Sequence, residues 1–219
     1  MRIFIILLCL FFHSHSCAEN DQAYLRYPTI FVNEPVKTWK SFRDDSIEKQ
    51  DEDFSCGSAA VATILRFFYG KEIYEKDILK EVIRVGDDGA ASFSDLEKSV
   101  KKFGFKAIGL TLDFEQLKQL KIPIVVYLRY RTKDHFSVIK GINQRNGLVS
   151  LADPSWGNRK FSERRFKAMW ESRDDHNLKG KILMIVPKNK KMALNNSFFV
   201  SPRQNNTGIK LLAIHNTAQ

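Results

Sequence analysis

The sequence predicts an α+β fold, and three observations support this prediction. Helix-forming segments come first along the chain, and short strand-forming segments follow instead of alternating with them. This segregation is typical of helices packed on a largely antiparallel sheet. The length of 219 residues and the hydrophobic content of 43% suffice for one sizeable core. We therefore expect one main domain, with an N-terminal helical half packed on a mainly antiparallel sheet.

The first 18 residues have the pattern of a secretory signal. A basic residue precedes an unbroken apolar run over residues 3–12, and small residues follow where signal peptidase acts. The run is too short to cross a bilayer, which needs about 20 apolar residues. We expect export to the periplasm or the exterior after cleavage near Ala18, with no transmembrane segment in the mature chain. A lipid anchor on Cys17 is disfavoured, because Ser14 stands where lipoprotein signals usually have leucine.

After this signal, we expect the main domain over residues 19–187 and a C-terminal tail over residues 188–219. The domain begins with an extended lead-in, since residues 19–49 contain two prolines and few apolar runs. The tail is rich in lysine and asparagine, and its apolar residues follow no clear period. Chain ends of this kind are commonly poorly ordered, so we expect the tail to be ordered only in part.

Two helices are expected early in the domain. Small and apolar residues recur at helical spacing from Cys56 until Gly70, which favours a left-handed stop. A second helix is expected over Tyr74 to Val85, because apolar residues recur there with Gly86 after them.

Two more helices are indicated by capping boxes. Ser94 with Glu97 three residues later predicts the start of a third helix, which Gly104 ends. Asp113 with Gln116 predicts a short fourth helix.

The remaining segments are mostly strands. They are short β-branched or aromatic runs separated by turn signals such as Asn146-Gly147. One further helix, Ser162 to Trp170, interrupts them. The expected strands cover residues 105–112, 124–130, 135–142, 148–153 and 182–186.

Cys56 is the candidate nucleophile, because it lies in the first turn of a predicted buried helix. The free amides and positive end of the helix dipole stabilise a thiolate there. Without the signal, Cys56 is the only cysteine, so it forms no internal disulfide and a reactive role is favoured. A lone cysteine also excludes a cysteine-cluster metal site, and no cofactor is implied. The structural alternative is a small buried residue beside Gly57.

A thiol nucleophile needs a base, and the mature chain offers His135, His176 and His215. His176 lies in a charged loop, and His215 lies close to the C-terminus, where a catalytic group is hard to hold within hydrogen-bonding reach. His135 opens a predicted strand, whose rigid backbone can aim the ring. The alternative for His135 is an ordinary surface residue at the start of a strand.

The base needs an acidic partner, and the transition state needs an oxyanion donor. Asp153 ends the next predicted strand, and the Asn146-Gly147 turn would place it beside the strand of His135. Gln50, six residues before Cys56, could donate to the oxyanion together with the Cys56 N–H. Taken singly, Asp153 could instead be a turn aspartate before a proline, and Gln50 a solvated loop residue.

Together these segments resemble the bacteriocin-processing (double-glycine leader) cysteine peptidase family over roughly Val36 to Val186. The resemblance implies a papain-like α+β fold with Cys56 as nucleophile, His135 as general base, Asp153 as its orienting residue and Gln50 in the oxyanion hole. The segments that carry it are Gln50, Cys56-Gly57 opening an Ala-rich helix that ends Phe-Phe-Tyr-Gly70, His135-Phe-Ser-Val-Ile-Lys-Gly141, Leu151-Ala-Asp-Pro-Ser-Trp-Gly157 and Phe161-Ser-Glu-Arg-Arg-Phe166.

The sequence departs from the family pattern in two respects. Family members commonly have Asp just before the cysteine and Pro two residues after it, where this chain has Ser55 and Ser58. The best-known members are cytoplasmic domains fused to a peptide-exporting ABC transporter, and this chain shows neither a membrane domain nor a phosphate-binding loop. We therefore expect a stand-alone exported member, for which cleavage at a double-glycine site is an inherited hypothesis.

The charge of the chain indicates which kinds of binding partner to expect. The formal net charge of +10 becomes +9 when Arg2 leaves with the signal, and the basic residues are scattered. We expect no nucleic-acid partner, but weak attraction to anionic surfaces.

The expected protein is a monomeric cysteine peptidase with a Cys-His-Asp triad, acting on a peptide or protein substrate. The alternatives are a thiol amidase or acyl transferase using the same residues, and a non-catalytic binding or immunity protein that keeps the fold.

Overall fold

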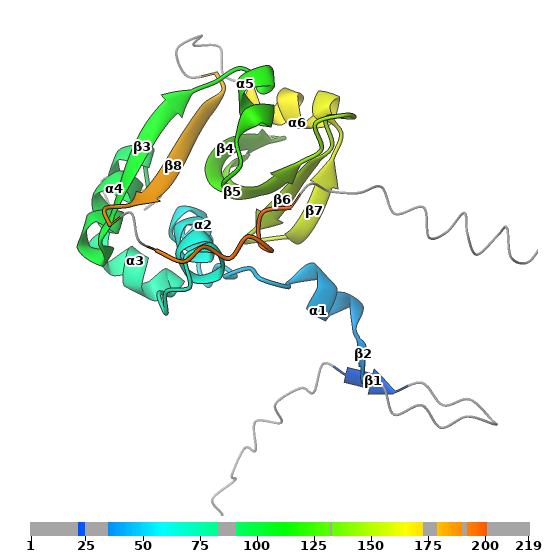
Figure 1. The fold of residues 1–219 in the computed structure, drawn as a ribbon, viewed down its shortest axis with the longest axis horizontal. Helices are drawn as coiled ribbons and strands as arrows, with labels where there is room; N and C mark the ends of the chain where they lie inside the picture. The colour runs from blue at the N-terminus through cyan, green and yellow to red at the C-terminus, as the bar shows by residue number, and fades with distance from the viewer. Residues whose placement is uncertain are drawn as a thin grey trace, which may run out of the picture. The chain divides into compact units, whose positions relative to one another are not determined.

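The computed structural model describes residues 22–24, 35–82, 91–131, 133–172, 179–189 and 192–200 (Figure 1). The predicted signal, His176 and His215 lie outside these ranges. The chain divides into two compact units between Ser41 and Phe42. In the first unit, β1 (Gln22–Tyr24) and β2 (Pro35–Lys37) pair antiparallel, which the sequence did not predict. Helix α1 (Trp39–Arg43) crosses the division.

The second unit is built on a six-stranded sheet in which every pair of neighbouring strands is antiparallel. Its spatial order is β3-β8-β4-β5-β6-β7. This sheet and the helices beside it confirm the predicted α+β class (Figure 1). The strands are β3 (Phe105–Thr111), β4 (Ile124–Tyr130), β5 (Lys133–Ile142), β6 (Val149–Asp153), β7 (Gly157–Phe161) and β8 (Lys181–Pro187).

Alternate strand residues contribute to two different hydrophobic cores, because successive side chains of a strand point to opposite faces. In β4, Val125 belongs to one core, while Ile124 and Val126 belong to the other. In β5, Val138 and Ile139 divide in the same way. The central strands are therefore covered on both faces.

Helices from different parts of the chain complete the two cores. The first core takes residues from α2, α3 and α4, and the second takes residues from α5 and α6. None of the helices in the described residues is both long and apolar enough to cross a membrane. The helices of this unit are α2 (Cys56–Thr63), continued by a π-helical turn over Ile64–Phe68, α3 (Glu75–Glu81), α4 (Phe93–Ser99), continued by a 3₁₀ turn over Val100–Phe103, α5 (Phe114–Gln119) and α6 (Glu163–Trp170).

The predicted start of the third helix is wrong by two residues. The capping box is formed by Ser92 and Asp95, whereas Ser94 lies inside α4. Starting at Ser92 places Phe93 in the first turn, where its ring packs against Tyr127 at 6.5 Å and Phe136 at 5.1 Å between centroids. The helix thus starts where Phe93 packs on two strands of the sheet, a contact that the local capping pattern does not contain.

Helix α5 agrees with its prediction, whereas α3 is shorter than predicted. The Asp113–Gln116 capping box is present and starts α5, as predicted. Helix α3 ends at Glu81, earlier than the predicted Val85, because Val82 is already extended. The predicted stop at Gly86 lies outside the described residues.

Part of the predicted tail packs against the second unit. Phe198 is buried in the first core, and the Asn195 N–H donates to the Phe68 carbonyl at the end of the π-helical turn. The Val200 N–H donates to the carbonyl of Lys140 in β5. Residues 192–200 therefore form part of the folded unit.

Candidate active site

Cys56 is the first residue of α2 and is 8% exposed. The first N–H groups of a helix have no acceptor within the helix, so they are available to an anion next to the thiol. Gly57 allows the start of the helix to lie close to β5. A Cβ atom at this position would lie 3.1 Å from side-chain atoms of both Leu96 and Phe136. The missing side chain thus helps to bring Cys56 towards the strand that carries His135.

The pairing of β5 with β6 brings His135 and Asp153 together. Val138 pairs with Ala152, so Ser137 lies opposite Asp153. His135 is two residues before Ser137 in β5 and therefore lies on the same face of the sheet. Diagonal neighbours of this kind are within reach of long side chains. His135 Nε2 lies 3.1 Å from Asp153 Oδ1 and 3.0 Å from Oδ2. The two residues are buried, at 8% and 1% exposure.

Asp153 is held as a carboxylate. Burial acts to raise its pKa, but the hydrogen bonds from His135 and the Trp156 N–H, with the charge of His135, lower the pKa overall. Its Oδ1 accepts the N–H groups of Ser155 at 3.0 Å and Trp156 at 2.9 Å. The turn after β6 therefore fixes the carboxylate that faces His135.

Cys56 also acts on the His135 ring, because interaction with the thiol raises the pKa of His135. Since Nε2 faces Asp153, Nδ1 is the ring nitrogen left for the sulfur. Burial acts to lower the pKa of His135, but the bonds to Asp153 and Cys56 and their charges raise it to about 9. An imidazole placed between a thiol and a carboxylate is the pairing that activates cysteine nucleophiles.

Gln50 lies beside the turn that follows Asp153. Its N–H donates to the Pro154 carbonyl at 3.3 Å, and its Oε1 accepts the Ser155 hydroxyl. Its Nε2 donates to the Glu52 carbonyl at 2.9 Å. An amide nitrogen carries two protons, so this bond leaves a second N–H donor. The structure thus joins Gln50, Asp153 and His135 through hydrogen bonds, with the Gln50 amide directed partly at its own loop. Cys56 is the further group that acts on His135.

Trp156 is a site residue that the sequence did not single out. Its ring lies 5.0 Å from the His135 ring and 4.8 Å from the ring of Tyr130, between centroids. An aromatic face stabilises an adjacent cation and shields it from water. Its position three residues after Asp153 was a possible signal, but nothing in the sequence pairs it with His135.

The raised pKa of His135 predicts that the protein loses stability in alkaline solution. The folded state keeps the imidazolium proton up to about pH 9, whereas the unfolded chain releases it near about 6.5. The stabilisation of the folded state by the charged His135 is complete below about pH 6.5, and it is lost as the pH rises through about 9. Between about pH 7 and about pH 10, the melting temperature of the wild type should fall more than that of His135→Gln. Equal falls, measured by circular dichroism, would contradict this assignment.

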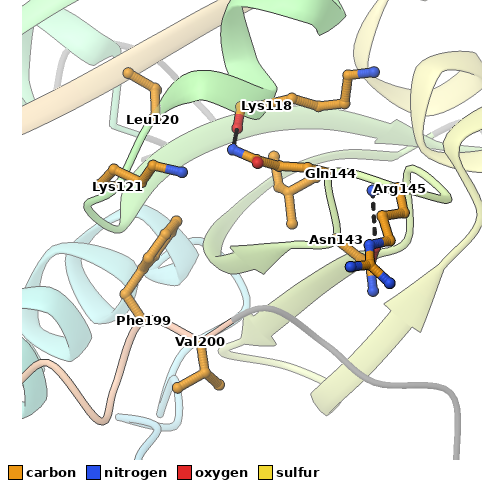
Figure 2. Close-up of a pocket in the computed structure, with 9 residues that line it drawn as sticks. Lys118, Leu120, Lys121, Asn143, Gln144, Arg145, Phe199 and Val200 are labelled. Carbon is orange, nitrogen blue, oxygen red and sulfur yellow. Dashed lines mark hydrogen bonds between the residues drawn. The ribbon is translucent and has the colours of Figure 1, made fainter.

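A concave surface lies at the other end of β5, around Ile142 (Figure 2). This open groove has a volume of about 970 Å³ and includes none of the four candidate residues. The Gln144 amide donates to the Lys118 carbonyl at 3.2 Å and joins its two sides. The groove is therefore separate from the candidate active site. Its lining residues are Lys118, Leu120, Lys121, Ile142, Asn143, Gln144, Arg145, Phe199 and Val200.

The arrangement around Cys56 can support nucleophilic chemistry. It combines a thiol, an imidazole, a buried carboxylate and amide donors, which are the parts needed for transfer of an acyl group to sulfur. Within the described parts of the chain, no group of three or more His, Cys, Asp or Glu side chains is placed to hold a metal ion.

Comparisons with known proteins point to one family. Residues 44–173 match the model of the peptidase C39 family. The chain is 29% identical over 157 residues to the probable functional amyloid protease FapD of Pseudomonas aeruginosa, an alignment that covers 68% of this chain and 69% of that protein. It is 31% identical to the FapD of Pseudomonas fluorescens, with 62% and 61% of the two chains covered.

Solved structures show the same fold. A double-glycine motif protease from an AMS/PCAT transporter, crystallised with its leader peptide, has a TM-score of 0.52 and 23% identity, covering 64% of this chain and 90% of that one. The peptidase domain of Streptococcus ComA has a TM-score of 0.53 and 20% identity, covering 64% and 97%. The expected papain-like fold is therefore confirmed.

Proposed function

The chain belongs to the peptidase C39 family, and on this premise we propose that it hydrolyses peptide bonds through an acyl-thioester on Cys56. The family assignment confirms the resemblance seen in the sequence and the assignment to the cysteine peptidases. The observation that best supports the role of Cys56 is the position of His135, whose Nε2 lies 3.0 Å from the Asp153 carboxylate and whose pKa is raised by Cys56 as well as by Asp153.

The proposed reaction has two steps. The Cys56 thiolate attacks the peptide carbonyl and forms a C–S bond, while the Gln50 amide and the Cys56 N–H donate to the oxyanion. The C–N bond then breaks as His135 gives its proton to the departing amine. Water next attacks the thioester, His135 takes a proton from it, and the acid product leaves with Cys56 restored. Asp153 holds the His135 ring and stabilises its charge throughout.

The proposed substrate is a peptide or a protein segment. The names of the FapD relatives refer to functional amyloid, and one structural neighbour is a double-glycine motif protease in complex with a leader peptide. We take a Gly-Gly site as the first sequence to test. We also propose that the protein acts as a monomer after export and signal cleavage near Ala18, a segment outside the described residues.

Acyl-enzyme trapping tests this function. Purified protein is mixed with a peptide that carries Gly-Gly before a fluorescent amide, quenched in acid, and analysed by mass spectrometry. We expect the acyl group on Cys56 and a free Gly-Gly acid as product, with much less cleavage of a matched Val-Val peptide. An acyl group on another residue would contradict the proposal. Transfer to an added amine in preference to water would favour the acyl transferase instead.

A further inference from the structure

Glu75 is a buried carboxylate that the reaction above does not use. It is the first residue of α3 and is only 3% exposed. Both of its oxygens lie 3.1 Å from the Asp51 N–H. Burial raises its pKa, although the nearby Ser55 and the hydrogen bond from the Asp51 N–H oppose this effect. A buried carboxylate is costly without such partners, so the contact of Glu75 with the loop before Cys56 calls for a role.

Glu75 is itself attached to the helix that carries Cys56. Its N–H donates to Glu48 Oε1 at 3.2 Å, and Glu48 Oε2 accepts from Arg66 at 2.7 Å. The Glu48 N–H donates to Thr63 Oγ1 at 3.0 Å. Thr63 is the last residue of α2, and Arg66 lies in the turn that continues it. Glu48 therefore links α2 to α3.

The loop is held from the opposite side by the sheet. The Gln50 N–H donates to the carbonyl of Pro154, directly after the proposed triad carboxylate. Adjacent residues 50 and 51 are thus fixed by Pro154 on one side and by Glu75 on the other. The direction of the Gln50 amide depends on this pair of contacts.

We propose that Glu75 is a positioning residue, which holds the loop over residues 50–55 so that Gln50 and the Cys56 N–H converge on the oxyanion. This inference rests on the function proposed above. Glutamine is a poor substitute at position 75, because it has one oxygen in place of two and would bring an N–H donor close to the Asp51 N–H.

An acidic residue at a helix start also stabilises the helix, and this simpler role must be separated from positioning. Asp77 lies in the same first turn, and its Oδ2 accepts the Tyr74 N–H at 3.1 Å. No contact of Asp77 with the loop over residues 50–55 is seen among the described residues. Asp77→Asn is therefore the matched control for Glu75→Gln.

The test compares two reactions of Cys56. Hydrolysis of the Gly-Gly peptide forms an oxyanion, whereas alkylation by iodoacetamide does not. For Glu75→Gln we expect kcat to fall about 10²-fold, as displacements of about 1 Å can do, with little change in KM. The alkylation rate at about pH 6, where an ordinary thiol reacts slowly, should stay at the wild-type value. Asp77→Asn should keep the wild-type kcat.

A double-mutant cycle completes the experiment. If Glu75 acts through Gln50, Glu75→Gln should add little to the loss caused by Gln50→Ala. The proposal would be overturned if the losses of the two variants were additive, or if Glu75→Gln left kcat unchanged. It would also be overturned if Glu75→Gln lost turnover and alkylation in parallel, through unfolding or otherwise. Failure of the proposed function has a different signature, which is wild-type turnover that does not require Cys56.

Discussion

Replacing Cys56 by Ala is expected to lower kcat on the order of 10⁶-fold, the loss seen when a protease nucleophile is removed. No other cysteine is found in the described residues, so no second thiol of this folded part can take its place. Alanine is a good helix former and slightly smaller than cysteine. The melting temperature should therefore stay close to that of the wild type. Hydrolysis of the Gly-Gly peptide and thermal unfolding of the same sample measure both quantities.

Ser58 provides the matched control for this change. It lies in the same turn of α2, is 1% exposed, and has the one side-chain N or O atom that is buried without a hydrogen-bond partner among the described residues. Removing such a hydroxyl should cost little stability. Ser58→Ala should therefore keep turnover, whereas Cys56→Ser should lose it as Cys56→Ala does. Turnover that survives in both Cys56 variants would favour the binding-protein alternative, with a contaminating enzyme as its source.

Asp153→Asn is expected to lower kcat about 10⁴-fold, the loss found for the corresponding change in a Ser-His-Asp triad. Asparagine keeps an oxygen that can accept the N–H groups of Ser155 and Trp156, so the turn should survive. Its amide would, however, donate to His135 Nε2 and place the ring proton on Nδ1. His135 could then no longer take a proton from the Cys56 thiol. The fold should be retained and the chemistry lost.

Asp134→Asn is the matched control for Asp153→Asn. It precedes His135 in β5 but pairs with Arg129 at 3.2 Å, and its side chain is 47% exposed. Asp134→Asn should therefore leave kcat and the melting temperature nearly unchanged. If Asp153→Asn also kept full turnover while His135→Ala lost it, Asp153 would serve the turn and not the base.

Local signals in the sequence predicted most elements of the second unit. The residues of β4 and the cap of α5 agree with prediction, because strand composition and capping chemistry depend on neighbours in the chain. The strand β7 was missed, since Gly157-Asn-Arg-Lys-Phe161 is polar in its middle and lies at the edge of the sheet. The π-helical turn after α2 was missed as well, because its residues have an ordinary helical pattern.

The candidate residues could be found from the sequence because their positions follow from nearby sequence patterns. Cys56 stands where a helix begins, and His135 and Asp153 stand on neighbouring strands joined by a short turn. The β5–β6 register then puts His135 and Asp153 on one face, a consequence of strand alternation that the sequence could anticipate. The sequence alone therefore determined which elements carry the proposed nucleophile, base and acid.

Only the tertiary structure decided what surrounds them. Ser155 meets Gln50 across a separation of 105 residues, and Glu75 meets Asp51 across 24. Trp156 lies on His135 because β6 and β5 are neighbours in the sheet, and Phe93 in the first turn of α4 packs on Phe136. Such contacts have no sequence pattern, since they depend on how separate elements pack and on the burial that makes their hydrogen bonds strong.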